Sequence, residues 1–183
     1  MFVHQADFRF ASLFERYWRA IRAEVSDIPR ADFVPVITPC AQGGDWLIFP
    51  LIADTHDPLY KSPDILQANQ ARCPCTVQLA REVPGLSSLA FTRMAPGTRI
   101  ERHVDQLAPP AWRFQLGLVT NPENRLRCGQ DTLRWQEGQA IIFDPQRTHD
   151  ADNRGGSDHI VLRLDVVKSR YNPRPITPRR VAQ

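Results

Sequence analysis

The chain has 183 residues, of which 42% are hydrophobic and 23% charged. This is enough for one substantial core and too little to expect two full domains. The net charge of +3 arises at the C-terminal end, because basic residues and no acidic ones follow Asp165: Lys168, Arg170, Arg174, Arg179 and Arg180. The rest of the chain is close to neutral and has no basic stripe with interleaved aromatic residues. We therefore expect no nucleic-acid partner.

The N-terminal sequence MFVHQADFRF lacks the basic region and long apolar run of a secretion signal. No stretch approaches the roughly 18 uncharged apolar residues of a membrane span. We therefore expect a cytoplasmic protein without a membrane partner. Of the cysteines, only Cys73 and Cys75 are close together, and Cys-Pro-Cys is not the Cys-x-x-Cys spacing of a zinc site. Reduced structural thiols are expected instead.

Two segments have the pattern of helices. Residues 8–25 repeat apolar side chains at steps of three and four, which predicts an amphipathic helix that ends before Pro29. Its apolar face comprises Phe10, Leu13, Phe14, Tyr17, Trp18 and Ile21. A shorter helix is predicted over Thr76–Glu82, where prolines flank both ends. We expect these helices to buttress a larger structure, with Phe14 and Trp18 packed against it.

From Leu86 onward, short apolar or alternating runs are separated by turns. The predicted strands are SLAFTRM, TRIERHVD, WRFQLGLV, RLRCG, TLRW, QAIIFD and HIVLRLDVV. Their short, regular spacing indicates an antiparallel sandwich or barrel. The segment PQRTHDADNRGGSD is predicted to be a loop, and the final SRYNPRPITPRRVAQ a proline-rich, basic tail. The chain is thus predicted to have one domain, 1–167, and a tail, 168–183.

Three residues have the chemistry of a metal site. His103 and Asp105 flank Val104 in a predicted strand, and His149 follows a later one. In a double-stranded β-helix, strands distant in sequence face each other, so these side chains can meet. Two imidazoles and a carboxylate on one face of an octahedron leave adjacent positions open, as in non-haem iron(II) oxygenases. The alternative for His149, taken alone, is a loop histidine capped by Asp150.

The last predicted strand has alternating residues that share one face: His159, Val161, Arg163 and Asp165. An arginine among apolar neighbours is costly to bury without a partner. A bound carboxylate is a suitable partner because a guanidinium grips it through two parallel hydrogen bonds. The alternative is an edge strand with Arg163 in solvent.

Several short motifs then follow one another in the order and near the spacing found in one known family. They are Trp46-x-x-Phe49-Pro50-Leu51, Cys73-Pro74-x-Thr76, Val83-Pro84-Gly85, Met94-x-Pro96-Gly97-Thr98-x-Ile100-x-x-His103, Arg113-x-x-Leu116-Gly117-Leu118, Trp135-x-Glu137-Gly138, Phe143-Asp144-x-x-x-x-His149 and Leu164-Asp165-Val166. With these motifs, residues 46–166 resemble the aspartyl/asparaginyl β-hydroxylase family of iron(II)- and 2-oxoglutarate-dependent oxygenases. The resemblance implies a mainly β fold, a double-stranded β-helix of the jelly-roll or cupin-like kind, with an N-terminal helical buttress.

The resemblance also implies the roles of individual residues. His103, Asp105 and His149 match the iron(II) site, although some family members have glycine at the position of Asp105 and use two histidines. Thr92 and Arg113 match residues that bind the cosubstrate 2-oxoglutarate.

The sequence departs from the family at two cosubstrate positions. Gln115 stands where the family usually has histidine, and His159 occupies the place of a second arginine. Arg163 lies four residues further along the same face, so either His159 or Arg163 is expected to hold the second carboxylate.

The expected activity is a 2-oxoglutarate-dependent dioxygenase reaction with O2 that hydroxylates an unactivated C–H bond of an amino acid or amino-acid residue, free, carrier-bound or in a peptide. Arg99, Arg102 and Arg147 are candidates to attract a carboxylate on the substrate, or are solvated charges at the rim. Acyl chains of membrane lipids are disfavoured, since no membrane segment is found.

Two other classes of function stay open. One is a non-catalytic, cupin-like metal- or small-ligand-binding protein with a degenerate 2-oxoglutarate pocket, motivated by His159 in the place of an arginine. The other is a basic-tailed interaction module, which rests only on residues 168–180.

Overall fold

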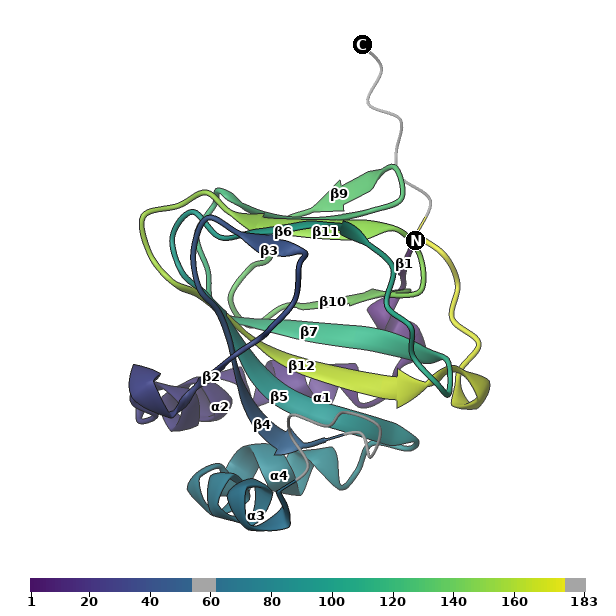
Figure 1. The fold of residues 1–183 in the computed structure, drawn as a ribbon. Coiled ribbons are helices and arrows are strands. Elements are labelled where there is room, and N and C mark those ends of the chain that lie inside the picture. The colour runs from purple at the N-terminus through teal and green to yellow at the C-terminus, as the bar shows by residue number, and fades with distance from the viewer. Residues whose placement is uncertain (54–61, 177–183) are drawn as a thin grey trace.

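The computed structural model describes residues 1–53 and 62–176. Its strands form two antiparallel sheets, a seven-stranded sheet in the order β1-β10-β7-β12-β5-β4-β2 and a five-stranded sheet in the order β3-β6-β11-β8-β9. Figure 1 shows the smaller sheet facing the larger one. From β5 to β8, and again from β10 to β12, each connection crosses between the sheets. The mainly β, jelly-roll architecture predicted from the sequence is confirmed.

The strands of the larger sheet are β1 (Phe2–Val3), β2 (Val34–Pro35), β4 (Trp46–Ile52), β5 (Leu86–Met94), β7 (Ala111–Val119), β10 (Ala140–Phe143) and β12 (His159–Val167). Those of the smaller sheet are β3 (Ala41–Gln42), β6 (Arg99–His103), β8 (Asn124–Cys128), β9 (Asp131–Leu133) and β11 (His149–Asn153).

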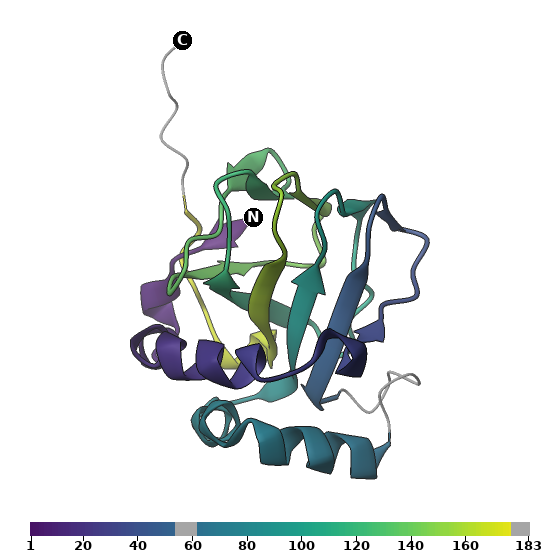
Figure 2. The ribbon, with the colours of Figure 1, turned by 90° about the vertical axis from the view of Figure 1, so that its left-hand side faces the viewer.

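Helices cover the side of the larger sheet that faces away from the smaller one (Figures 1 and 2). They are α1 (Ala11–Arg16), α2 (Trp18–Ser26), α3 (Pro63–Arg72) and α4 (Pro74–Ala80), with short 3-10 helices at Gln5–Asp7, Arg30–Asp32 and Lys168–Arg170. Pro63 and Pro74 each begin a helix. Proline is well suited to this position, because the first N–H groups of a helix have no hydrogen-bond partner within it.

The single helix predicted over residues 8–25 is two helices. The chain turns out of helical geometry at Tyr17, with φ −95° and ψ 11°, and the Tyr17 side chain is exposed. Phe14 is fully buried, as predicted, whereas Trp18 is only partly buried at the edge of the same cluster. The helix predicted over Thr76–Glu82 is α4, two residues earlier.

The side chains of β12 alternate between the two faces of the larger sheet, one covered by the helices and one facing the smaller sheet. Ile160, Leu162, Leu164 and Val166 pack into the cluster beneath the helices. The opposite face, from His159 to Asp165, points into the space between the sheets, as predicted. Arg163 is therefore directed into the barrel and not into solvent.

Strand β11 lies within the segment that was predicted to be a loop. Its outward residues Asp150 and Asp152 pair across strands with Arg127 and Arg125 of β8, at 2.8 and 2.7 Å. The inward residue between them is Ala151. A strand that alternates acidic and small residues carries no apolar signal, which explains why the sequence pattern did not reveal it.

The segment after β12 packs on the N-terminal segment, in contrast to the predicted boundary at residue 167. Tyr171 stacks on Phe8 at 4.8 Å, and Arg174 pairs with Asp7 at 2.8 Å. Residues 168–176 are thus part of the fold, and the remaining predicted tail, 177–183, lies outside the described residues.

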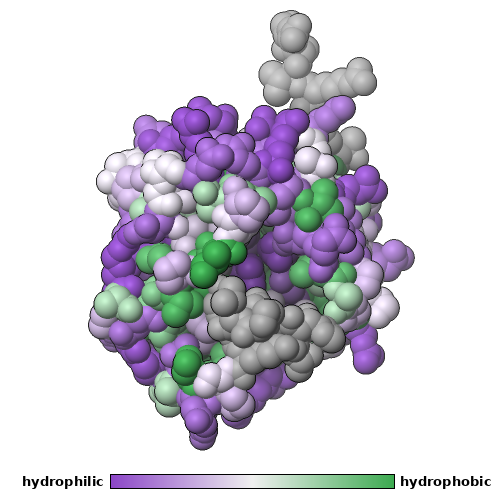
Figure 3. Space-filling model, in the orientation of Figure 1, coloured by the Kyte–Doolittle hydropathy of each residue, from purple (hydrophilic) through white to green (hydrophobic). Residues whose placement is uncertain are grey.

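The space between the sheets is apolar at one end and hollow at the other. Phe2, Trp135, Ile141 and Phe143 belong to the cluster that fills the apolar end. At the other end a cavity of about 430 Å³ opens to the surface. Figure 3 shows a hollow in this face. The surface inside the hollow is hydrophilic, and hydrophobic surface lies beside its opening.

Candidate metal centre and cosubstrate pocket

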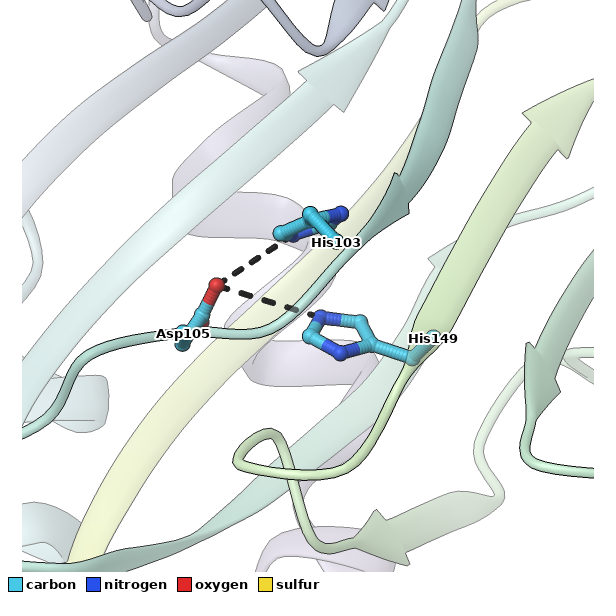
Figure 4. Close-up of side chains that lie close together, drawn as sticks. All are labelled: His103, Asp105 and His149. Carbon is cyan, nitrogen blue, oxygen red and sulfur yellow. Dashed lines mark ion pairs between the residues drawn. The ribbon is translucent and has the colours of Figure 1, made fainter.

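His103, Asp105 and His149 converge at the end of the smaller sheet. His103 ends β6, His149 begins β11, and the two are register partners. Asp105 follows β6 and places Oδ1 3.2 Å from His103 Nε2 and 4.0 Å from His149 Nε2 (Figure 4). One ligand atom from each residue lies within 4.8 Å of the other two. The structure thus brings together the three residues predicted to bind metal.

A β-bulge in β6 directs His103 inward. His149 pairs with His103, whereas Ala151 pairs with Ile100, so β6 has one more residue than β11 between these pairs. Without the bulge, residues three apart would face opposite sides of the sheet. With it, both Ile100 and His103 face the interior, and Arg102 faces outward, where it pairs with Asp150.

Hydrogen bonds to the backbone orient both imidazoles. His103 Nδ1 lies 2.7 Å from the Glu101 carbonyl, and His149 Nδ1 lies 2.9 Å from the Arg147 carbonyl. A carbonyl can only accept, so Nδ1 carries the proton in the neutral ring. Each Nε2 is then left with a lone pair toward Asp105, which is the orientation that metal-binding histidines need.

Electrostatics favours a carboxylate and a neutral imidazole in this site. Burial alone would raise the pKa of Asp105, but the Arg113 guanidinium and the two histidines hold it well below its ordinary value. In the protonated ring His103 Nε2 donates to Asp105, which raises the pKa of His103, whereas burial lowers that of His149 to about 4. Asp105 and His149 are therefore in the protonation states of metal ligands at neutral pH.

The donor set fits a divalent first-row metal. Two imidazole nitrogens and one carboxylate oxygen on one side of an ion leave other positions accessible. Adjacent ligand atoms of an octahedral site lie about 3 Å apart when the bonds are about 2.1 Å long. The separations of 3.2 and 4.0 Å at Asp105 Oδ1 would have to contract, the second by about 1 Å, for all three atoms to bind one ion.

A row of ion pairs links the triad to the larger sheet. Arg113, which is buried, donates from Nε and Nη2 to the carboxylate of Asp165, at 2.8 and 2.9 Å. Its Nη1 donates to Asp105 Oδ2. Arg113, predicted to bind cosubstrate, thus has two aspartate partners.

The open cavity has a charged floor, and its walls combine apolar side chains with the polar Thr38, Ser87 and Gln106. Its floor includes His103, Asp105, Arg113, Arg163 and Asp165. Its walls come mainly from β4 and from the segment before β7, and include Ile48, Pro50, Ile52, Leu107, Pro109 and Ala111. A molecule in this cavity would contact His103 and Asp105 at one end and apolar side chains along its walls.

A smaller cavity of about 30 Å³ lies deeper in the barrel. All the residues predicted to bind cosubstrate line it: Thr92, Arg113, Gln115, His159 and Arg163. It has room for about one or two water molecules. Trp135 closes one side of it, since its ring contacts His159 in a tilted arrangement, with centroids 4.5 Å apart, and its Nε1 donates to Gln115 at 3.2 Å.

The structure does not bring the predicted substrate arginines to this site. Arg99 and Arg102 lie on the outer face of the smaller sheet, in a shallow groove with Asp150 and Asp152. The Arg147 side chain is 62% exposed beside Asp144. None of the three is among the described residues that line the open cavity. The reason is geometric, because the pleat and the bulge of β6 turn its arginines outward.

Two residues of the site were not singled out from the sequence. Asp165 was quoted in a motif without a role, although its place on the face of Arg163 could have suggested one. Trp135 was likewise quoted in a motif without a role, because its contact with His159 joins segments that are distant in sequence.

The fold and the inward-facing triad define a cupin-like jelly-roll protein with a candidate metal centre. The profile of the aspartyl/asparaginyl β-hydroxylase family matches residues 15–169, and the chain belongs to this family.

Two curated relatives span most of the chain. An ornithine lipid ester-linked acyl 2-hydroxylase of Rhizobium tropici is 28% identical over 92% of this chain, and the human aspartyl/asparaginyl β-hydroxylase is 27% identical over 87%. The match spans 60% of the bacterial relative and 21% of the human one.

A solved structure has the same fold. An oxidoreductase of the 2OG-Fe(II) oxygenase family from Burkholderia pseudomallei aligns with a TM-score of 0.53 and 14% identity, over 86% of this chain and 81% of that one. Within residues 1–53 and 62–176, no helix is both long and apolar enough to span a membrane.

Proposed function

We propose that this protein is an iron(II)- and 2-oxoglutarate-dependent hydroxylase whose metal is held by His103, Asp105 and His149. The observation that carries the proposal is the convergence of these side chains beside a cavity whose floor also contains Arg113 and Arg163. Bound iron would supply the activation of dioxygen that C–H hydroxylation needs. The family and its named relatives support the same reaction.

We propose that Arg163, and not His159, holds the distal carboxylate of 2-oxoglutarate. His159 is 1% exposed and burial lowers its pKa to about 4, so it is uncharged at neutral pH. The cavity on which it borders is too small for a carboxylate chain. Arg163 lines both cavities and is charged, so it can pair with an anion at the inner end of the open one.

The charged side chains on the floor of the open cavity favour binding of a cosubstrate with two negative charges. Arg113 and Arg163 are balanced by Asp105 and Asp165. A divalent cation would leave this partly buried site with an excess of positive charge, which is costly without a counterion. A dicarboxylate bound beside the cation would restore the balance.

The substrate we propose first is an amino acid or an amino-acid residue, in agreement with the family and the human relative. The lining of the cavity indicates which part of the substrate reacts. Because apolar side chains of β4 and of Leu107, Pro109 and Ala111 line much of the walls, and the predicted arginines lie elsewhere, we expect an uncharged carbon of the substrate to be the part that reacts.

An ester-linked acyl chain is a second candidate substrate. The sequence disfavoured this class, because no membrane segment was found in it. The apolar side chains of β4 and of Leu107, Pro109 and Ala111 in the cavity walls nevertheless suit an aliphatic chain. The name of the Rhizobium tropici relative points to the same class.

Succinate formation tests the proposal. The protein would be incubated aerobically with iron(II), ascorbate and 2-oxoglutarate, with an aspartate-containing peptide or an ester-linked acyl lipid, and the products followed by NMR and mass spectrometry. We expect one substrate class to increase succinate and to gain one oxygen atom. The His149→Ala protein is the matched control. Iron binding without succinate in any mixture would favour the non-catalytic binding protein.

A further inference from the structure

Asp165 is a buried acid that the proposed reaction does not use. It lies on β12, directly across the sheet from Arg113 on one side and Ser88 on the other. Burial would raise its pKa, but the charges of Arg113 and Arg163 lower it below the ordinary value. An aspartate that is 4% exposed and ionised is costly unless it is fully paired. Its partners therefore indicate what it does.

The contacts of Asp165 fix the plane of the Arg113 guanidinium. Arg113 donates two nearly parallel hydrogen bonds to it, at 2.8 and 2.9 Å, and the Ser88 hydroxyl donates a third, at 3.2 Å. This fork arrangement sets direction as well as distance. With Nε and Nη2 engaged, Nη1 is the nitrogen that reaches Asp105.

The two oxygens of Asp105 consequently have different neighbours. Oδ2 accepts from Arg113, while Oδ1 faces the imidazoles of His103 and His149. If Asp165 did not occupy the fork, Arg113 could turn its fork to Asp105 and engage both oxygens. That would withdraw the ligand atom from the metal centre.

We propose that Asp165 is a positioning residue of the metal centre, which acts through Arg113 to present Asp105 Oδ1 alone to the metal. This inference rests on the proposed metal site. Arg113 is thereby a bridge between two aspartates, in addition to any contact it makes with cosubstrate.

The test is the affinity of the full-length protein for cobalt(II) alone, measured by titration without cosubstrate or substrate, with the visible absorption of the ion as a report on its coordination. Asp165→Asn keeps the shape of the side chain and removes its charge. We expect cobalt to bind about 10- to 100-fold more weakly, as when other partners of metal ligands are removed, with an altered spectrum.

A second variant separates positioning from the effect of charge. Arg113→Lys keeps the positive charge but has no fork to join the two aspartates. Positioning predicts a similar weakening in Arg113→Lys, whereas an effect of charge alone predicts an unchanged affinity. If Asp165→Asn does not fold, Arg113→Lys carries the test by itself. Circular dichroism and melting curves establish whether each variant is folded.

A third comparison shows whether Asp165 acts through Asp105. In an Asp105→Ala background, Asp165→Asn should weaken cobalt binding no further, since the ligand that it positions is absent. Unchanged affinity in the folded variants, or an equal loss in the Asp105→Ala background, would overturn the inference. A wild-type protein that binds no cobalt would instead remove the proposed metal site itself.

Discussion

His103 and His149 are direct partners across β6 and β11, with ring centroids 4.2 Å apart. The ladder of backbone hydrogen bonds, and not contact between the side chains, brings them together. Each ring is then oriented by a carbonyl of its own strand or of the turn before it. The fold itself thus places the side chains of the candidate metal centre, and loss of one imidazole should not undo the strand pairing.

The His149→Ala protein should therefore lose iron(II) binding and keep its fold. Isothermal titration under anaerobic conditions measures the first, and circular dichroism the second. His4→Ala is the matched control, because His4 is exposed and its backbone alone is bonded. Iron binding of wild-type strength in the His149→Ala protein would contradict the assignment of this ligand.

Arg163→Met should raise the dissociation constant of 2-oxoglutarate at least about tenfold, since a hydrogen bond to a charged group contributes about 1.5–3 kcal/mol. His159→Ala should have a much smaller effect, because His159 is uncharged and borders a cavity that is too small for the cosubstrate. Both constants are measured with iron(II) and without oxygen. A loss confined to His159→Ala would show that the carboxylate lies at the family position.

The stability of the protein should fall as the pH is lowered from about 7 toward 4.5. His159 has a pKa of about 4 in the folded state and 6.5 as the ordinary value. The unfolded chain therefore binds the proton more readily between these values, and stability present above pH 6.5 is lost as the pH falls.

The His159→Phe protein should lack this part of the pH dependence, which amounts to about 2 kcal/mol in the free energy of unfolding between those pH values. Denaturant titrations with a chelator present would measure it in both proteins. Parallel pH profiles for wild type and variant would refute the contribution of His159.

The helix residues Phe14 and Trp18 should differ in their effect on stability. Phe14→Ala should cost about 3–5 kcal/mol because its side chain is fully buried. Trp18→Ala should cost about half as much, since this ring is partly buried, packs near Gly138 and is covered by Arg19 at 4.8 Å.

Neither substitution should change the activity per folded molecule, because the helices cover the outer side of the larger sheet (Figure 1) and neither Phe14 nor Trp18 is among the described residues that line the cavity. A Trp18→Ala protein with an unaltered melting temperature and a lost activity would place this ring in the substrate site instead.

The sequence predicted those features that repeat with a regular period. The alternation of HIVLRLDVV predicted that Arg163 shares one face with His159 and Asp165, and the structure confirms it and turns this face inward. Strand β11 escaped prediction because Asp150 and Asp152 are stabilised by arginines of β8, a contact that sequence periodicity does not contain.

In the site, too, some features could be predicted from the sequence and others depend on tertiary contacts. The order of the motifs was sufficient to predict that His103, Asp105 and His149 lie together. The outward direction of Arg102 depends on one extra residue in β6, and the engagement of Arg113 by Asp165 depends on the register of β7 and β12. Bulges and registers of this kind follow from tertiary packing and are not encoded in a local pattern.

The most direct test of the central claim, that iron(II) and 2-oxoglutarate bind together at His103, Asp105 and His149, is an anaerobic absorption spectrum of the purified protein. Adding both to the wild-type protein should produce a weak visible metal-to-ligand charge-transfer band, which arises only when the cosubstrate chelates the iron. The band should be absent in the His149→Ala protein and should need more 2-oxoglutarate in the Arg163→Met protein. A wild-type protein that binds iron but shows no band at any 2-oxoglutarate concentration would contradict the claim and leave a metal-binding protein without the oxygenase reaction.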